Sequence, residues 1–130
     1  MDTEYQKIAK QYSVSHMSNT KWRKLFFCWA KSGIKIKFSE WSFIGSEHKE
    51  IYRLPNENDL MENRFSDGYF QPFEYKWIST IYIPSNYKPV SKVGFMLEQD
   101  TDGLKEIAKS VGNFPIFNKK GGIEIRGYEK

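Results

Sequence analysis

Residues 73–83 read FEYKWISTIYI, and this stretch decides the fold. It is rich in β-branched and aromatic residues, which suit the pleated surface of a strand. Both alternating sets of positions carry aliphatic or aromatic side chains, a pattern typical of a strand covered on both faces. Pro84 ends the run, since proline lacks the N–H that a sheet partner needs. The stretch therefore predicts a central strand.

Weaker strand signals precede this stretch. Residues 34–38 (IKIKF) alternate with period two, which predicts a half-buried strand. Residues 41–44 continue the pattern, so the two runs are expected to form a hairpin. Gly45-Ser46 marks a further turn, and residues 49–54 indicate a third strand.

Helical spacing appears in three segments. Residues 3–12 carry apolar side chains at helical intervals, which predicts a short helix. Residues 20–32 form a stronger amphipathic pattern that follows N-cap candidates at 18–20 and stops at Gly33. A last helix is expected from Asp100 or Thr101 up to Gly112.

The C-terminal part predicts a β-hairpin. Residues 114–117 and 123–128 flank Lys119-Lys120-Gly121-Gly122, which suits a Gly-Gly turn. Helices at both ends of the strand runs indicate an α+β fold, with an antiparallel sheet of about four to six strands and two or three helices packed on one face. A length of 130 residues predicts a single globular domain over residues 1–130.

The side-chain composition favours binding over catalysis. The chain has 10 Phe, 8 Tyr and 4 Trp but only 2 His and 1 Cys. Aromatic side chains supply contact area, whereas His and Cys supply much of the acid–base, nucleophilic and metal chemistry of enzymes. We therefore expect a non-enzymatic protein without a cofactor or metal. A single cysteine, no apolar run of membrane-spanning length and no secretion signal at the N-terminus predict a cytoplasmic location.

The charge is unevenly placed along the chain. The net charge is +4, made of +5 in residues 1–54, −4 in residues 55–75 and +3 in residues 76–130. Residues 55–72 read as a long loop, and such loops often carry function. Acidic residues and two aromatic residues gather in or beside this loop, and we predict that they bind a partner protein. These six residues are Glu57, Asp59, Glu62, Asp67, Tyr69 and Phe70.

Two other classes of function stay open. A nucleic-acid-associated protein would use basic residues of the second helix and of the strand predicted after it. These residues are Lys21, Arg23, Lys24, Lys35 and Lys37. An enzyme would need His16 or His48 to meet the loop carboxylates in a pocket, and neither histidine has a neighbour at metal-ligand spacing.

Three stretches resemble a family of small uncharacterised bacterial proteins that open with an N-T-K-W-R-x-L helix. They are residues 19–26 (NTKWRKLF), residues 72–84 with their PFEYK and IYIP runs, and residues 123–128 (IEIRGY). The resemblance implies an immunity protein of contact-dependent inhibition, which neutralises a cognate toxin domain by occluding its active site. It supplies no catalytic residues. The positive net charge departs from nuclease inhibitors, which are usually acidic, so it places a nuclease target in doubt or confines the contact to the acidic loop.

Overall fold

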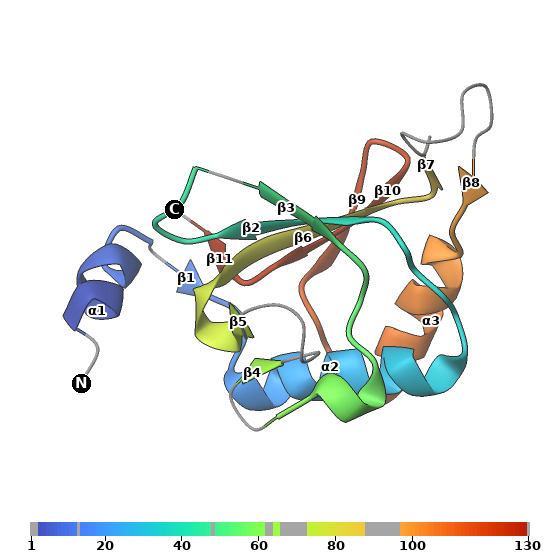
Figure 1. The fold of residues 1–130 in the computed structure, drawn as a ribbon, viewed down its shortest axis with the longest axis horizontal. Helices are drawn as coiled ribbons and strands as arrows, with labels where there is room; N and C mark the ends of the chain where they lie inside the picture. Colours follow the sequence, from blue (N-terminus) through green and yellow to red (C-terminus); the bar gives the residue numbers. More distant parts are fainter. Residues whose placement is uncertain are drawn as a thin grey trace.

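A five-stranded antiparallel sheet forms the centre of the protein, and helices α2 and α3 cover one of its faces (Figure 1). The computed structural model describes residues 3–12, 14–47, 49–61, 64–65, 73–87 and 97–129. The strand order is β3 (Lys49–Tyr52), β2 (Ser39–Phe43), β6 (Ile78–Pro84), β10 (Gly122–Arg126) and β9 (Ile116–Lys119). The predicted α+β class, with an antiparallel sheet of four to six strands, is confirmed.

Strand β6 lies in the middle of the sheet, as the opening stretch predicts. Its inward side chains Ile81 and Ile83 are fully buried and share cross-strand rows with Ile123 and Ile125 of β10. Such rows are the unit by which a sheet is stabilised. Trp41 of β2 extends the row of Ile81 on the other side and is also fully buried.

The strand does not run through residues 73–83 without a break, so this part of the prediction is wrong. Residues Phe73–Glu74 form β5, and Tyr75–Trp77 form the 3₁₀ turn η2 before β6 begins. The turn places Tyr75 in the core, where its hydroxyl donates to the carbonyl of Met61 at 2.9 Å. Burial of this large ring outweighs the strand preference of the local sequence.

Residues 34–38 are not a strand either, which corrects a second prediction. They belong to no helix or strand, and β2 begins only at Ser39. The hairpin partner of β2 is therefore β3, joined through the turn at Gly45, instead of residues 34–38. The alternation of IKIKF reflects one-sided burial, with Ile36 5% exposed, and not pairing with a neighbouring strand.

Helix α2 (Asn19–Ser32) matches the predicted helix. The Ser18 hydroxyl accepts from the N–H of Lys21 at 3.1 Å, and Gly33 ends the helix with φ +82°, a conformation that favours glycine. The apolar stripe of α2 packs on the sheet. Its buried members are Trp22, Leu25, Phe26 and Trp29.

Helix α3 (Thr101–Val111) packs beside α2 under the same face of the sheet (Figure 1). The Asp100 carboxylate caps it by accepting from the N–H of Gly103 at 2.9 Å. Leu104 and Ala108 are buried, and the carbonyl of Leu104 accepts from the Trp29 indole at 2.9 Å. This bond ties the two helices together.

Strands β9 and β10 form the predicted terminal hairpin, but the turn lies one residue earlier than expected. Lys120 and Gly121 have φ values of +46° and +76°, so they are the two turn residues. Gly122 already belongs to β10, where its Cα approaches β6 so closely that a side chain would collide with the carbonyl of Ile83. The second glycine is therefore required by a close backbone approach.

The face of the sheet turned away from the helices carries a buried carboxylate. Glu124 of β10 is 6% exposed, and it accepts from Lys119 at 2.6 Å and from Arg126 at 2.9 Å. Burial raises the pKa of this carboxyl, but the hydrogen bonds and charges of the two cations outweigh it and hold the pKa below its ordinary value.

The N-terminal segment attaches to one end of the sheet. Helix α1 (Thr3–Ala9) is followed by β1 (Val14–Ser15), which pairs with β11 (Tyr128–Glu129). The hydroxyls of Tyr5 and Tyr128 are 2.5 Å apart, and the Tyr5 ring meets Trp77 edge to face at 5.3 Å. Aromatic contacts thus hold this segment in place.

Four short elements complete the described chain. The 3₁₀ turn η1 (Glu57–Asp59) lies against α2, β4 (Arg64–Phe65) pairs with β5, and β7 (Asn86–Tyr87) pairs with β8 (Leu97–Glu98). Within the described ranges, no helix has the length and apolar character needed to cross a bilayer.

Candidate functional site

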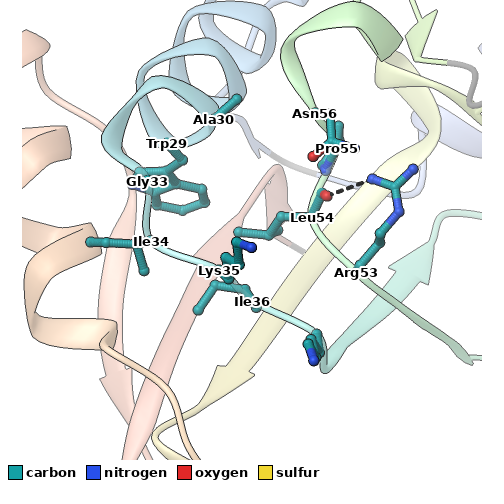
Figure 2. A pocket seen from close by; sticks show the side chains of 11 residues that line it. Trp29, Ala30, Gly33, Ile34, Lys35, Ile36, Arg53, Leu54, Pro55 and Asn56 are labelled. Carbon is teal, nitrogen blue, oxygen red and sulfur yellow. Dashed lines mark hydrogen bonds between the residues drawn. The ribbon is translucent and has the colours of Figure 1, made fainter.

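A groove opens where the β2–β3 hairpin stops pairing. Ser39 and Tyr52 form the last regular pair of the ladder, and beyond them one backbone hydrogen bond, from the N–H of Leu54 to the carbonyl of Ile36 at 3.4 Å, joins the two chains beside the C-terminal end of α2. The space between them measures about 350 Å³ and is lined by residues 29–30, 33–37 and 53–56. Figure 2 shows Ile34, Lys35 and Ile36 on one side and Arg53, Leu54 and Pro55 on the other. We call it the stem groove.

The floor of the stem groove is apolar and fixed. Trp29, Ile36 and Leu54 are 2%, 5% and 9% exposed and belong to the hydrophobic core. Because the Trp29 indole donates to Leu104 of α3, its ring cannot rotate without breaking a buried hydrogen bond. The floor is therefore formed before any ligand arrives, which lowers the entropic cost of binding.

The rim of the stem groove is cationic. Lys35, Lys37 and Arg53 line it, whereas no Asp or Glu among the described residues does. Arg53 is partly neutralised, since its guanidinium meets the Asp59 carboxylate at 3.1 Å and also donates to the carbonyl of Leu54 (Figure 2). Lys35 and Lys37 are exposed and form no ion pair within the part of the chain that the structure describes. The groove therefore carries a net positive charge.

The side chain of Gln99 keeps the stem groove open. Its Oε1 accepts from the N–H groups of Lys37 and Phe38, both at 3.0 Å, and its Nε2 donates to the carbonyls of Phe38 and Pro84 at 3.0 and 2.9 Å. The register Glu40–Tyr82, continued by two positions, would place Phe38 opposite Pro84 in the β2–β6 ladder. The amide of Gln99 occupies that place, so the chain before Ser39 leaves the sheet.

A second hollow lies on the surface between α2 and α3. It measures about 550 Å³ and is lined by Lys24, Phe27, Cys28, Lys31, Ile107 and Val111, among others. Phe27 is 45% exposed, although it stands on the helix that carries the core aromatics. We call this surface, together with the adjoining Arg23, the helix face. Helix α2 contains four basic residues and no acidic one, so the helix face is cationic as well.

The six predicted partner-binding residues divide into two groups. Glu57 lies in η1 beside the helix face, with its Oε1 3.3 Å from the Lys31 ammonium. Asp59 is 9% exposed and accepts from the backbone N–H of Asn56 at 2.9 Å as well as from Arg53. Its carboxylate thus fixes η1. The other four, Glu62, Asp67, Tyr69 and Phe70, lie outside the described residues. The role assigned to all six stays a prediction.

The basic residues predicted for nucleic-acid contact do not form one patch. Lys21, Arg23 and Lys24 lie in the N-terminal half of α2, whereas Lys35 and Lys37 follow its C-terminal end. The last eight residues of α2 lie between the two groups and separate them by roughly 12 Å along the helix axis. The expected strand face that would carry Lys35 and Lys37 does not exist, because residues 34–38 are not a strand.

The Cys28 thiol and the Tyr75 hydroxyl lie in surroundings that disfavour their ionised forms. Burial raises the pKa of the Cys28 thiol, which also donates to the carbonyl of Leu25 at 3.1 Å. Burial likewise raises the pKa of Tyr75 to about 12. Within the described ranges, no three His, Cys, Asp or Glu side chains gather as metal ligands do. His16 lies 3.5 Å from Glu129, and His48 is outside the described residues.

Sequence reasoning missed Phe27, Arg53 and Gln99. Phe27 could have been found, since it is an aromatic residue off the buried stripe of an amphipathic helix. Arg53 and Gln99 gave no local signal, because their roles depend on chain segments far away in the sequence. In comparisons with known proteins, no family model, no curated protein and no solved structure matches this chain.

Proposed function

We propose that this chain is a non-enzymatic protein-binding module of the immunity type, which neutralises a cognate toxin domain by covering its active site. The observation that carries the proposal is the exposed Phe27 ring on α2, with the Lys31 ammonium 5.6 Å from its centroid. Aromatic residues and arginine dominate the hot spots of protein interfaces, and Arg23 and Lys24 line an adjoining hollow on the other side of Phe27.

The helix face has the physical character of a docking platform. Its backbone belongs to a capped helix whose opposite side is buried in the core, so little entropy is lost when a partner binds. Its apolar hollow can accept a side chain of the partner, and its cations would steer an acidic surface toward it. We therefore expect the covered region of the toxin to be acidic, with Glu57 at the border of the contact.

The same cations favour nucleic acid as the second candidate. Lys21, Arg23 and Lys24 stand within the first turns of a helix that has no acidic residue. Phosphate contacts of this kind make binding fall steeply with salt concentration. Protein binding ranks first because the helix face combines these charges with an apolar hollow, which a phosphate backbone would leave unfilled.

The test is coexpression with toxin domains encoded upstream of the gene, followed by calorimetry of the complex. Phe27→Ala should weaken binding about 30-fold and abolish protection of the cells. Phe117→Ala is the matched control, because Phe117 is 40% exposed but lies on β9 beneath Arg126, on the opposite face of the sheet. It should change the affinity less than about threefold.

Two results would overturn the proposal. Protection against none of these toxin domains would remove the immunity function. Equal effects of the two phenylalanine variants would remove the helix face from the contact. Titration with duplex DNA and with RNA at several salt concentrations tests the second candidate, and a steep loss of binding with salt would favour it over the first.

A further inference from the structure

We propose that the stem groove is a second binding site, and that it takes a small organic acid with an apolar body and a single carboxylate. The site lies at the C-terminal end of α2, whereas Phe27 marks the middle of the helix. The proposal stands independently of the toxin-binding function, since it uses different side chains.

The shape and floor of the stem groove select the body of the ligand. Pockets for small molecules are concave and mostly apolar, and their volumes begin near 300 Å³. The stem groove, at about 350 Å³, has this size, and the buried Trp29, Ile36 and Leu54 form its floor. One aromatic ring system or a short branched chain fits such a space. A larger cofactor does not.

The rim selects a negative charge. Lys35 and Lys37 have no ionic partner among the described residues, and Figure 2 shows Lys35 between the two walls of the groove. The backbone N–H of Ile36 also forms no hydrogen bond within that part of the chain. Ile36 lines the groove, so an acceptor of the ligand could pair with this N–H. A carboxylate satisfies both the ammonium groups and this N–H.

The C-terminal end of α2 limits that charge to one unit. Gly33 and Ala30 line the groove, so the carbonyl end of the helix faces it. This end carries a partial negative charge, which opposes a second negative charge on the ligand. A phosphate or diphosphate binds best at the opposite end of a helix, where N–H groups point outward. We therefore favour a carboxylate over a phosphorylated ligand.

The experiment is an NMR titration of the full chain with 2-naphthoate, compared with the neutral 2-naphthalenemethanol. We expect saturable shifts confined to residues 29–37 and 53–56, and affinity at least about tenfold lower for the neutral analogue. The double variant Lys35→Glu/Lys37→Glu should lose naphthoate binding. Lys49→Glu/Lys109→Glu makes the same change of charge on exposed positions elsewhere and should retain it.

The outcomes that contradict the proposal are equally specific. No saturable shift up to about 10 mM naphthoate would remove the site. Equal affinity for the neutral analogue would remove the role of the lysines, and equal loss in both double variants would do the same. Dispersed spectra of each variant show that it is folded. Phe27→Ala should bind naphthoate normally, so failure at the helix face and failure at the stem groove are distinguishable.

Discussion

Replacing Gln99 by Met tests the origin of the stem groove directly. Methionine has a similar length and flexibility, but it can neither accept nor donate the hydrogen bonds of the amide. The change removes four side-chain hydrogen bonds and leaves the backbone groups of Lys37, Phe38 and Pro84 without those partners. Gln99 is 8% exposed, so water replaces the lost bonds only in part.

The cost follows from the surroundings of each bond. Three of the four bonds are partly buried, and each contributes about 1 kcal/mol net. The bond to the Pro84 carbonyl is buried, and leaving that carbonyl unsatisfied costs about 1–3 kcal/mol. The better burial of the thioether offsets part of this loss. We expect the free energy of unfolding to fall by about 3–5 kcal/mol, a large share of the stability of an ordinary domain.

Urea denaturation followed by tryptophan fluorescence measures this change. Gln11→Met, at an exposed position, is the matched control and should alter the free energy of unfolding by less than about 0.5 kcal/mol. Hydrogen exchange of the Phe38 amide should also become faster in Gln99→Met, and naphthoate binding should weaken. A loss below about 1 kcal/mol with unchanged exchange at Phe38 would refute the role assigned to Gln99.

Two further predictions concern the terminal hairpin. Gly122→Ala should lower the free energy of unfolding, measured by urea denaturation, by about 2–3 kcal/mol, because the new side chain meets the carbonyl of Ile83. Gly121→Ala places its side chain in open space at φ +76° and should lower it by only about 1 kcal/mol. Equal losses in the two variants would contradict the close approach of Gly122 to β6. Glu124 has a pKa held below its ordinary value of 4.5, so its contribution to stability is present above that pH and is lost as the pH falls through the lower folded pKa. Glu124→Gln should therefore lower the free energy of unfolding by about 1 kcal/mol at pH 7 and make it fall less as the pH is lowered. If the free energy of unfolding falls as steeply at low pH in the variant as in the original protein, this carboxylate is not the cause of the fall.

Helices and their ends could be predicted because their determinants are local. Ser18 and Gly33 bound α2, and Asp100 and Gly112 bound α3, as the sequence indicates. The central position of β6 could be predicted as well, since apolar residues on both faces exclude an edge strand. The interruption at Tyr75 could not, because it depends on the space that the core offers to one ring.

The candidate sites were predictable only in part. Lys35 and Lys37 stand out in the sequence, but their partner residues Arg53 and Leu54 join them only because the β2–β3 ladder ends at Ser39. The end of a strand ladder is set by chain geometry or by a competing hydrogen bond, and neither can be predicted from the local sequence. The exposed Phe27 was the more accessible signal, since a helical projection already separates it from the buried stripe.

The failure of IKIKF to form a strand explains why the stem groove exists at all. Alternation records which side chains face the core, and Ile36 satisfies it although its backbone makes only one cross-chain hydrogen bond, from the N–H of Leu54 to its carbonyl, and belongs to no strand. Pairing needs a partner chain in register, and at Phe38 the amide of Gln99 takes that place. The hydrogen bonds of Gln99 hold residues 37–38 in place at the wall of the stem groove. Loss of naphthoate binding in Gln99→Met would therefore have the same cause as its loss of stability.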